Sequence, residues 1–83
     1  MKITFKLFAT LGQWLPEGAN ANAAQVQVAD GATAHQIIDQ FGVPRDKVHL
    51  VLVNGVYLDA EARDVSNIHE GDALAVWPPV AGG

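Results

Sequence analysis

A short amphipathic helix near the middle of the sequence restricts the fold more than any other feature. Its apolar positions follow the i, i+3, i+4, i+7 spacing of one helix face and are Ala34, Ile37, Ile38 and Phe41. Thr33-Ala34-His35-Gln36 has the form of a capping box, and Gly42 followed by Pro44 suits a helix end. A helix of about nine residues is too short to be stable alone. It must therefore pack on a sheet.

The segments on both sides of this helix predict the strands of that sheet. Residues 2–8 alternate, with Ile3, Phe5 and Leu7 on one face, and residues 25–28 and 73–77 alternate in the same way. Residues 49–53 and 56–58 flank Asn54-Gly55, a strong hairpin signal. The order β, β, α, β, short β, β predicts an α+β fold, in which one main helix covers one face of a mixed sheet of four or five strands.

The remaining segments predict only short elements. Thr10-Leu11-Gly12-Gln13 is a second possible capping box and opens a short turn that Pro16 ends. Residues 59–70 are polar, with Val65 and Ile68 as isolated apolar anchors.

Composition excludes several classes of function. The chain has 83 residues, which is one domain, and it has no cysteine for a disulfide, a thiolate nucleophile or an iron–sulfur cluster. Five scattered basic residues in a chain of net charge −4 argue against nucleic acid as a partner. No apolar run approaches the roughly 18 residues of a membrane span. We expect a cytoplasmic protein that binds neither nucleic acid nor membrane.

The sequence predicts no active site of its own. His35, His49 and His69 are too far apart in the sequence to form a metal-binding motif, so no metal site is expected. Ser66, the only serine, lacks the glycines of a nucleophile elbow. Asp59, Glu61 and Asp64 are read as a solvated face rather than a cation site. We therefore expect a protein that is not an enzyme.

The end of the sequence is its most specific stretch. Residues 1–77 form the predicted domain, and residues 78–83 form an extended tail, Pro78-Pro79-Val80-Ala81-Gly82-Gly83. The two prolines favour an extended path that projects the tail from the domain. Glycine has no Cβ, so Gly82-Gly83 can enter a channel too narrow for other residues. An inert, frayed terminus is the alternative.

A candidate binding surface lies on the sheet face that the helix leaves open. The alternation places Phe8 and Trp77 on that face, each at the end of its strand, and Tyr57 is out of phase with Val56 and Leu58. An exposed aromatic cluster beside an extended tail is typical of a protein-docking patch. Isolated exposed aromatics, which are common, are the alternative.

These residues together resemble the MoaD/ThiS family of ubiquitin-like sulfur carriers, and most closely MoaD, the small subunit of molybdopterin synthase. The resemblance rests on residues 75–83 and on Leu7-Phe8-Ala9, Val53-Asn54-Gly55 and Glu70-Gly71-Asp72. It implies a β-grasp (ubiquitin-like) fold, in which the first and last strands are parallel neighbours in the middle of the sheet.

The resemblance also implies roles for individual residues. Gly83 would supply a carboxylate that an E1-like enzyme adenylates with ATP and that a sulfur donor protein converts to a thiocarboxylate, while Gly82 lets the tail thread the partner's pocket. No cofactor would bind the carrier itself. The molybdopterin synthase large subunit would be a further partner. The positions matched to partner binding are Phe8, Tyr57, Trp77, Pro78, Pro79, Val80 and Ala81.

Two departures leave the pathway open. Ala81 stands where molybdopterin carriers often have threonine, and the Asn54-Gly55 turn is closer to the thiamine-type carriers. A carrier for thiamine or another pathway and a ubiquitin-like protein modifier are therefore alternatives. A β-grasp interaction domain with an inert tail is a third, from a different class.

Overall fold

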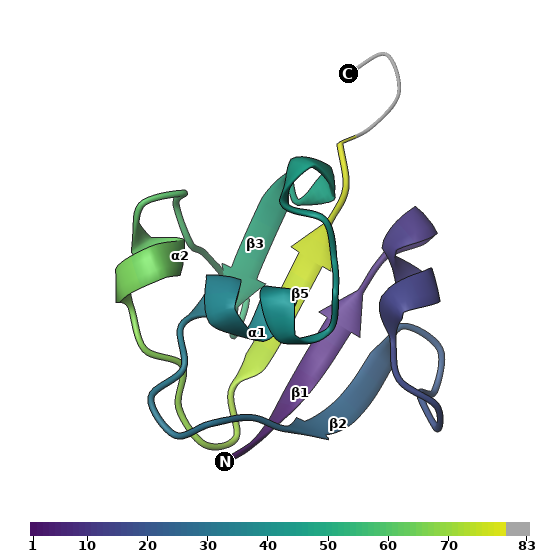
Figure 1. The fold of residues 1–83 in the computed structure, drawn as a ribbon, viewed down its shortest axis with the longest axis horizontal. Coiled ribbons are helices and arrows are strands. Elements are labelled where there is room, and N and C mark those ends of the chain that lie inside the picture. Colours follow the sequence, from purple (N-terminus) through teal and green to yellow (C-terminus); the bar gives the residue numbers. More distant parts are fainter. Residues whose placement is uncertain (80–83) are drawn as a thin grey trace.

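The computed structural model describes residues 1–79 of the chain (Figure 1). The strands are β1 (Lys2–Leu7), β2 (Ala23–Gln27), β3 (Leu50–Val53), β4 (Val56–Tyr57) and β5 (Ala73–Trp77). The helices are α1 (Ala34–Gln40), α2 (Ala62–Val65) and the 3₁₀ helices η1 (Ala9–Trp14) and η2 (Arg45–Lys47). None of the helices within residues 1–79 has the length and apolar character needed to cross a membrane.

The strands form one mixed five-stranded sheet in the order β2-β1-β5-β3-β4. β1 and β5 pair in parallel at its centre, with Phe5 opposite Leu74 and Leu7 opposite Val76. The other neighbouring pairs are antiparallel. This arrangement confirms the predicted α+β class and the β-grasp order, including the parallel pairing of the first and last strands.

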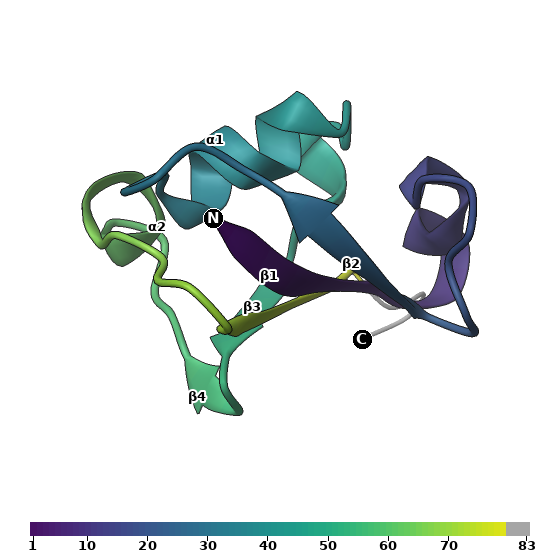
Figure 2. The same ribbon diagram turned by 90° about the horizontal axis from the view of Figure 1, so that it is seen from below.

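The core lies between α1 and one face of the sheet (Figure 2). Ile3, Phe5 and Leu7 of β1 are fully buried there, as the alternation predicts. Ile37 and Ile38 of α1 pack into the same core, and the ring of Phe41 lies 5.0 Å from that of Phe5, centroid to centroid. Each such side chain contributes about 1.5–3 kcal/mol on burial. This packing explains how a seven-residue helix is stable.

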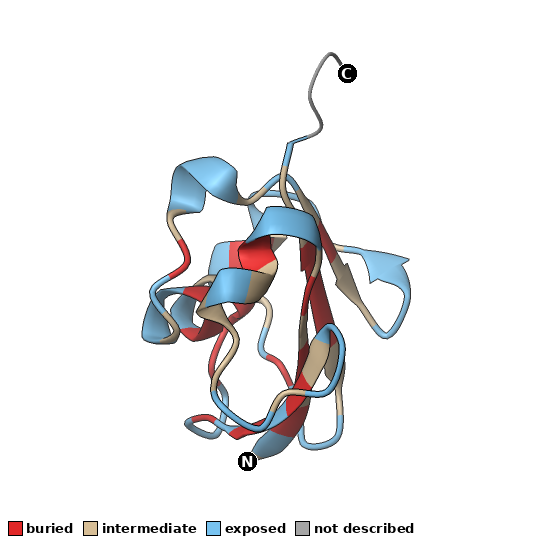
Figure 3. Cartoon of the chain, turned by 90° about the vertical axis from the view of Figure 1, so that its right-hand side faces the viewer, coloured by how far each residue is buried: buried red, intermediate tan, exposed pale blue. Residues whose placement is uncertain are grey.

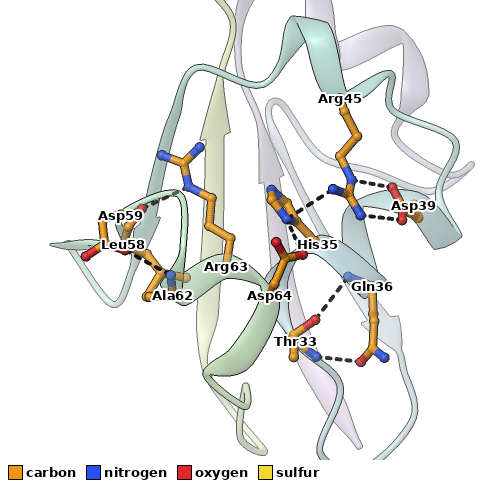
Figure 4. Close-up of polar contacts among 10 residues, drawn as sticks. All are labelled: Thr33, His35, Gln36, Asp39, Arg45, Leu58, Asp59, Ala62, Arg63 and Asp64. Atoms are coloured by element: carbon orange, nitrogen blue, oxygen red, sulfur yellow. Dashed lines mark hydrogen bonds and ion pairs between the residues drawn. The ribbon is translucent and has the colours of Figure 1, made fainter.

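The structure confirms one predicted capping box and rejects the other. At the start of α1 the backbone N–H of Gln36 donates to Thr33 Oγ1, and the Gln36 side chain accepts from the Thr33 N–H (Figure 4). Thr10 does not cap η1, because the 3₁₀ helix already begins at Ala9 and Phe8 is the residue at its N-cap. The buried Leu11 fixes that early start, since its N–H donates to the Phe8 carbonyl.

One predicted anchor in residues 59–70 is correct and the other is wrong. Ile68 is 2% exposed, but Val65 is 74% exposed. The buried residue of α2 is Arg63. A single helical turn can direct only one side toward the sheet, and α2 directs Arg63 there and leaves Val65 in solvent.

The predicted Asn54-Gly55 hairpin is present, with φ of 52° and 82°, the left-handed values of a type I′ turn. The Asn54 side chain also ties this turn to the start of β5. It donates to Asp72 Oδ1 and accepts from the N–H of Ala73. Asp72 Oδ2 accepts a third bond, from the backbone N–H of His69.

The two capping-box sequences provide a matched pair of variants. We expect Thr33→Ala to lower the free energy of unfolding by about 1 kcal/mol, because it removes the oxygen that caps α1. Thr10→Ala removes no cap and should lower it by less than about 0.5 kcal/mol. Urea denaturation monitored by circular dichroism measures both. Equal losses in the two variants would contradict this assignment of the caps.

Asp72 makes the stability of the fold depend on acid pH. Burial alone would raise its pKa, but the hydrogen bonds from Asn54 and from the His69 N–H, with the nearby charge of His69, together hold the pKa below its ordinary value. A lowered pKa in the folded state contributes stability above the unfolded value of about 3.9, and this is lost as pH falls through the folded pKa. Denaturation at a series of pH values should therefore show a shallower acid loss for Asp72→Asn than for the parent. Identical curves would be evidence against this role.

Candidate functional site

Phe8 and Trp77 lie side by side on the face of the sheet opposite α1. Phe8 follows β1, and its N–H donates to the Val76 carbonyl at 3.1 Å, so the parallel register continues past Leu7. The two rings stack with their centroids 4.2 Å apart and their planes within 2°. The predicted juxtaposition of these two aromatics is therefore correct, but both rings are half-buried and not exposed as the sequence analysis expects, since each covers part of the other. Their role in binding a partner stays a prediction.

β3 adds two residues that the sequence analysis missed. Leu50 pairs with Trp77, and Leu52 pairs with both Ala75 and Tyr57, so all of them share the open face. Tyr57 is 57% exposed. The alternation of Leu50 and Leu52 with the buried Val51 carries the signal, but it becomes readable only once β3 is known to pair with β5. Ala75 is buried beneath its neighbours, and the other members of the set apart from Tyr57 are half-buried. We call this set the docking surface: Phe8, Leu50, Leu52, Tyr57, Ala75 and Trp77.

The chain leaves the sheet at the edge of the docking surface. The Trp77 carbonyl accepts from the His49 N–H at 2.9 Å. Pro78, half-buried, and Pro79, exposed, have no N–H with which to extend the β5 ladder. Figure 3 shows the buried central strands and the exposed turn and β4 strand of the β3–β4 hairpin. Val80, Ala81, Gly82 and Gly83 lie outside the described residues, so their roles also stay predictions.

Arg63 is a second feature that the sequence analysis missed. It is 6% exposed although it carries a full charge. Its Nε donates to the Leu58 carbonyl at 2.9 Å (Figure 4), and its Nη2 donates to the His49 carbonyl at 3.3 Å. Its Cζ lies 5.9 Å from the centroid of the Tyr57 ring. Nothing in the sequence around Arg63 distinguishes it from the other polar residues of 59–70.

Two ion pairs lie on the helix side of the molecule. Arg45 binds Asp39 through two hydrogen bonds of 2.8 Å, which hold the pKa of that carboxyl below its usual value. His35 Nδ1 of α1 meets Asp64 Oδ1 of α2 at 2.7 Å (Figure 4). Over residues 1–79, no group of three or more acidic or histidine side chains is placed to hold a metal ion. The Arg45–Asp39 pair is about half exposed, and an ion pair of that exposure contributes little to stability.

Comparison with known proteins places the chain in a family. The profile of the Mut7-C ubiquitin family (Ub-Mut7C) matches residues 1–82, so the chain belongs to that family. We found no match among curated proteins.

Solved structures share the whole fold. Small archaeal modifier protein 1 (SAMP1) of Haloferax volcanii is 26% identical with a TM-score of 0.67, and ThiS, a thiamine biosynthesis protein of Geobacter metallireducens, is 22% identical with a TM-score of 0.66. A complex of subunits 1 and 2 of the molybdopterin-converting factor of Helicobacter pylori contains a chain 16% identical, with a TM-score of 0.58. Each alignment covers 100% of both chains. The resemblance to the MoaD/ThiS carriers is confirmed at the level of the fold and the ubiquitin-like family.

Adjacent residues of β5 test which side chains face solvent. We expect Trp77→Glu to lower the free energy of unfolding by about 1–2 kcal/mol, because the half-buried ring and its stack with Phe8 are lost but no charge enters the core. Val76→Glu would place a charge in the core beside Leu7 and should cost more than about 4 kcal/mol. Thermal denaturation of the two variants distinguishes them. Severe destabilisation by Trp77→Glu would show that this ring belongs to the core.

Proposed function

We propose that the protein is a cytoplasmic sulfur carrier that works from the end of its tail. The observation that carries the proposal is the position of the docking surface, which ends at Trp77, where the chain leaves the sheet toward Pro78 and Pro79. In a partner bound to the open face, the tail would therefore begin at a defined point. The ubiquitin-like family and the Gly82-Gly83 end support the same function.

The proposed chemistry takes place on Gly83 inside a partner. A carboxylate is a poor electrophile. An oxygen of the Gly83 carboxylate attacks the α-phosphate of ATP bound to an E1-like enzyme, which gives an acyl-adenylate and releases pyrophosphate. Sulfide carried by a donor protein then attacks the acyl carbon, AMP leaves, and a thiocarboxylate remains. Gly82 allows this end to enter a narrow pocket. The carrier is a protein substrate in these steps and not a catalyst.

For the pathway, we propose the small subunit of molybdopterin synthase, which would donate the sulfur while bound to the large subunit. The sequence of residues 75–83 supports this assignment, and so does the shared fold with a chain of the two-subunit molybdopterin-converting factor. A protein modifier is the second candidate, favoured by the 26% identity with SAMP1 over both whole chains. It would use the same activation but deliver the acyl carbon to an amine.

Intact-mass measurement tests the carrier chemistry. After incubation with ATP, an E1-like enzyme and a sulfide source, we expect a mass increase equal to the replacement of one oxygen by sulfur, located at Gly83. The increase should be absent without ATP and in a variant that lacks Gly82-Gly83. An unchanged mass with related E1-like enzymes would favour the interaction domain with an inert tail.

The affinity for the same E1-like enzyme, measured by titration calorimetry, tests the docking surface. Phe8→Glu should weaken binding to the E1-like enzyme by at least about tenfold, because a charge replaces the ring that stacks on Trp77. Lys47→Glu, a charge change in η2, is the matched control and should bind as the parent does. Two further assays separate the two candidate pathways. Dithiolene formation with a molybdopterin synthase large subunit would support the small-subunit assignment, and conjugation to lysine would support the protein modifier.

A further inference from the structure

Arg63 binds two backbone carbonyls and lies against the Tyr57 ring, and the proposed function assigns no role to these contacts. Its two carbonyl partners lie at the edge of the sheet where β4, only two residues long, has ended. The His49 carbonyl precedes β3, and the Leu58 carbonyl follows β4. A strand edge normally needs a neighbour for such groups. The guanidinium takes the place of that neighbour with two donors held in one plane.

Both residues that Arg63 binds are joined to the strands of the docking surface. The N–H of His49 donates to the Trp77 carbonyl, the last β5 group with a partner before Pro78. The N–H of Leu58 donates to the Val51 carbonyl, which continues the hairpin that carries Tyr57. Arg63 thus connects, through one residue on each side, the exit of the tail and the hairpin.

The third contact of Arg63 reaches the docking surface itself. Its guanidinium carbon lies 5.9 Å from the centroid of the Tyr57 ring, within the range of a cation–π interaction. Tyr57 is more than half exposed, so few other contacts restrict its ring. The buried cation, by contrast, is fixed by its two carbonyl bonds.

We propose that Arg63 is a positioning residue for the docking surface. Its guanidinium sets the orientation of the Tyr57 ring and the place where the chain leaves Trp77, although Arg63 itself is buried and touches no partner. The proposal rests on the proposed function in so far as the docking surface binds an E1-like enzyme. A lysine could not replace this residue, because its single ammonium lacks the planar fork that serves two carbonyls and stacks on a ring.

Nuclear magnetic resonance tests the structural part without a partner. In Arg63→Met we expect the ring signals of Tyr57 and the amide signals of His49 and Leu58 to shift, and Arg63→Lys should not restore them. Arg45→Met, which removes an arginine from the helix side of the molecule, is the matched control and should leave these signals in place. Unchanged Tyr57 signals in Arg63→Met would overturn the proposal. If Arg63→Met does not fold, Arg63→Lys alone provides the same comparison.

A double-mutant cycle tests the functional part with the E1-like enzyme that supports thiocarboxylate formation. We expect Arg63→Met to weaken binding about tenfold in the parent but less than about threefold when Tyr57 is already leucine. Equal losses in both backgrounds would indicate a general structural role and overturn the proposal. Should the parent bind no E1-like enzyme while the Tyr57 signals still depend on Arg63, the proposed function fails and the positioning role of Arg63 stands.

Discussion

The parallel pairing of β1 with β5 is the constraint on which the rest of the structure depends. Parallel neighbours cannot be joined by a tight turn, so the chain between them must cross over the sheet. That crossover supplies α1, which buries one face, and the β3–β4 hairpin, which extends the sheet beyond β5. The pairing also brings Phe8 and Trp77, which are far apart in sequence, into a stack. One register therefore fixes both the core and the open face.

One face of the sheet stays open because only α1 is long enough to cover a face. α1 covers the side on which Ile3, Phe5 and Leu7 point, and the alternate residues of the same strands are left to solvent. A small domain with one covered face must either make the other face polar or use it for binding. Here the face is mixed: Lys2, Thr4 and Lys6 alternate along β1, and apolar residues occupy the end near the tail.

The sequence was sufficient for the fold because its patterns are local and agree with one another. Alternation predicted β1 and β5, the Thr33–Gln36 cap predicted the start of α1, and Asn54-Gly55 predicted the hairpin. The misses share a different cause. The role of Leu50 and Leu52 depends on which strand pairs with β3, and the burial of Arg63 depends on carbonyls at the ends of β3 and β4. Neither the pairing of β3 with β5 nor the contacts of Arg63 with these carbonyls can be read from a single sequence.

The placement of β5 also has a mechanical consequence. A force on the tail acts along β5, which is held on one side by β1 and on the other by β3. The ladder bonds run across the strands, so such a force loads many of them together in shear instead of opening them one by one. The outermost are the bonds from Phe8 to Val76 and from His49 to Trp77. The tail is thus attached to a central strand that is paired on both sides, and it can be pulled into a partner without peeling the sheet.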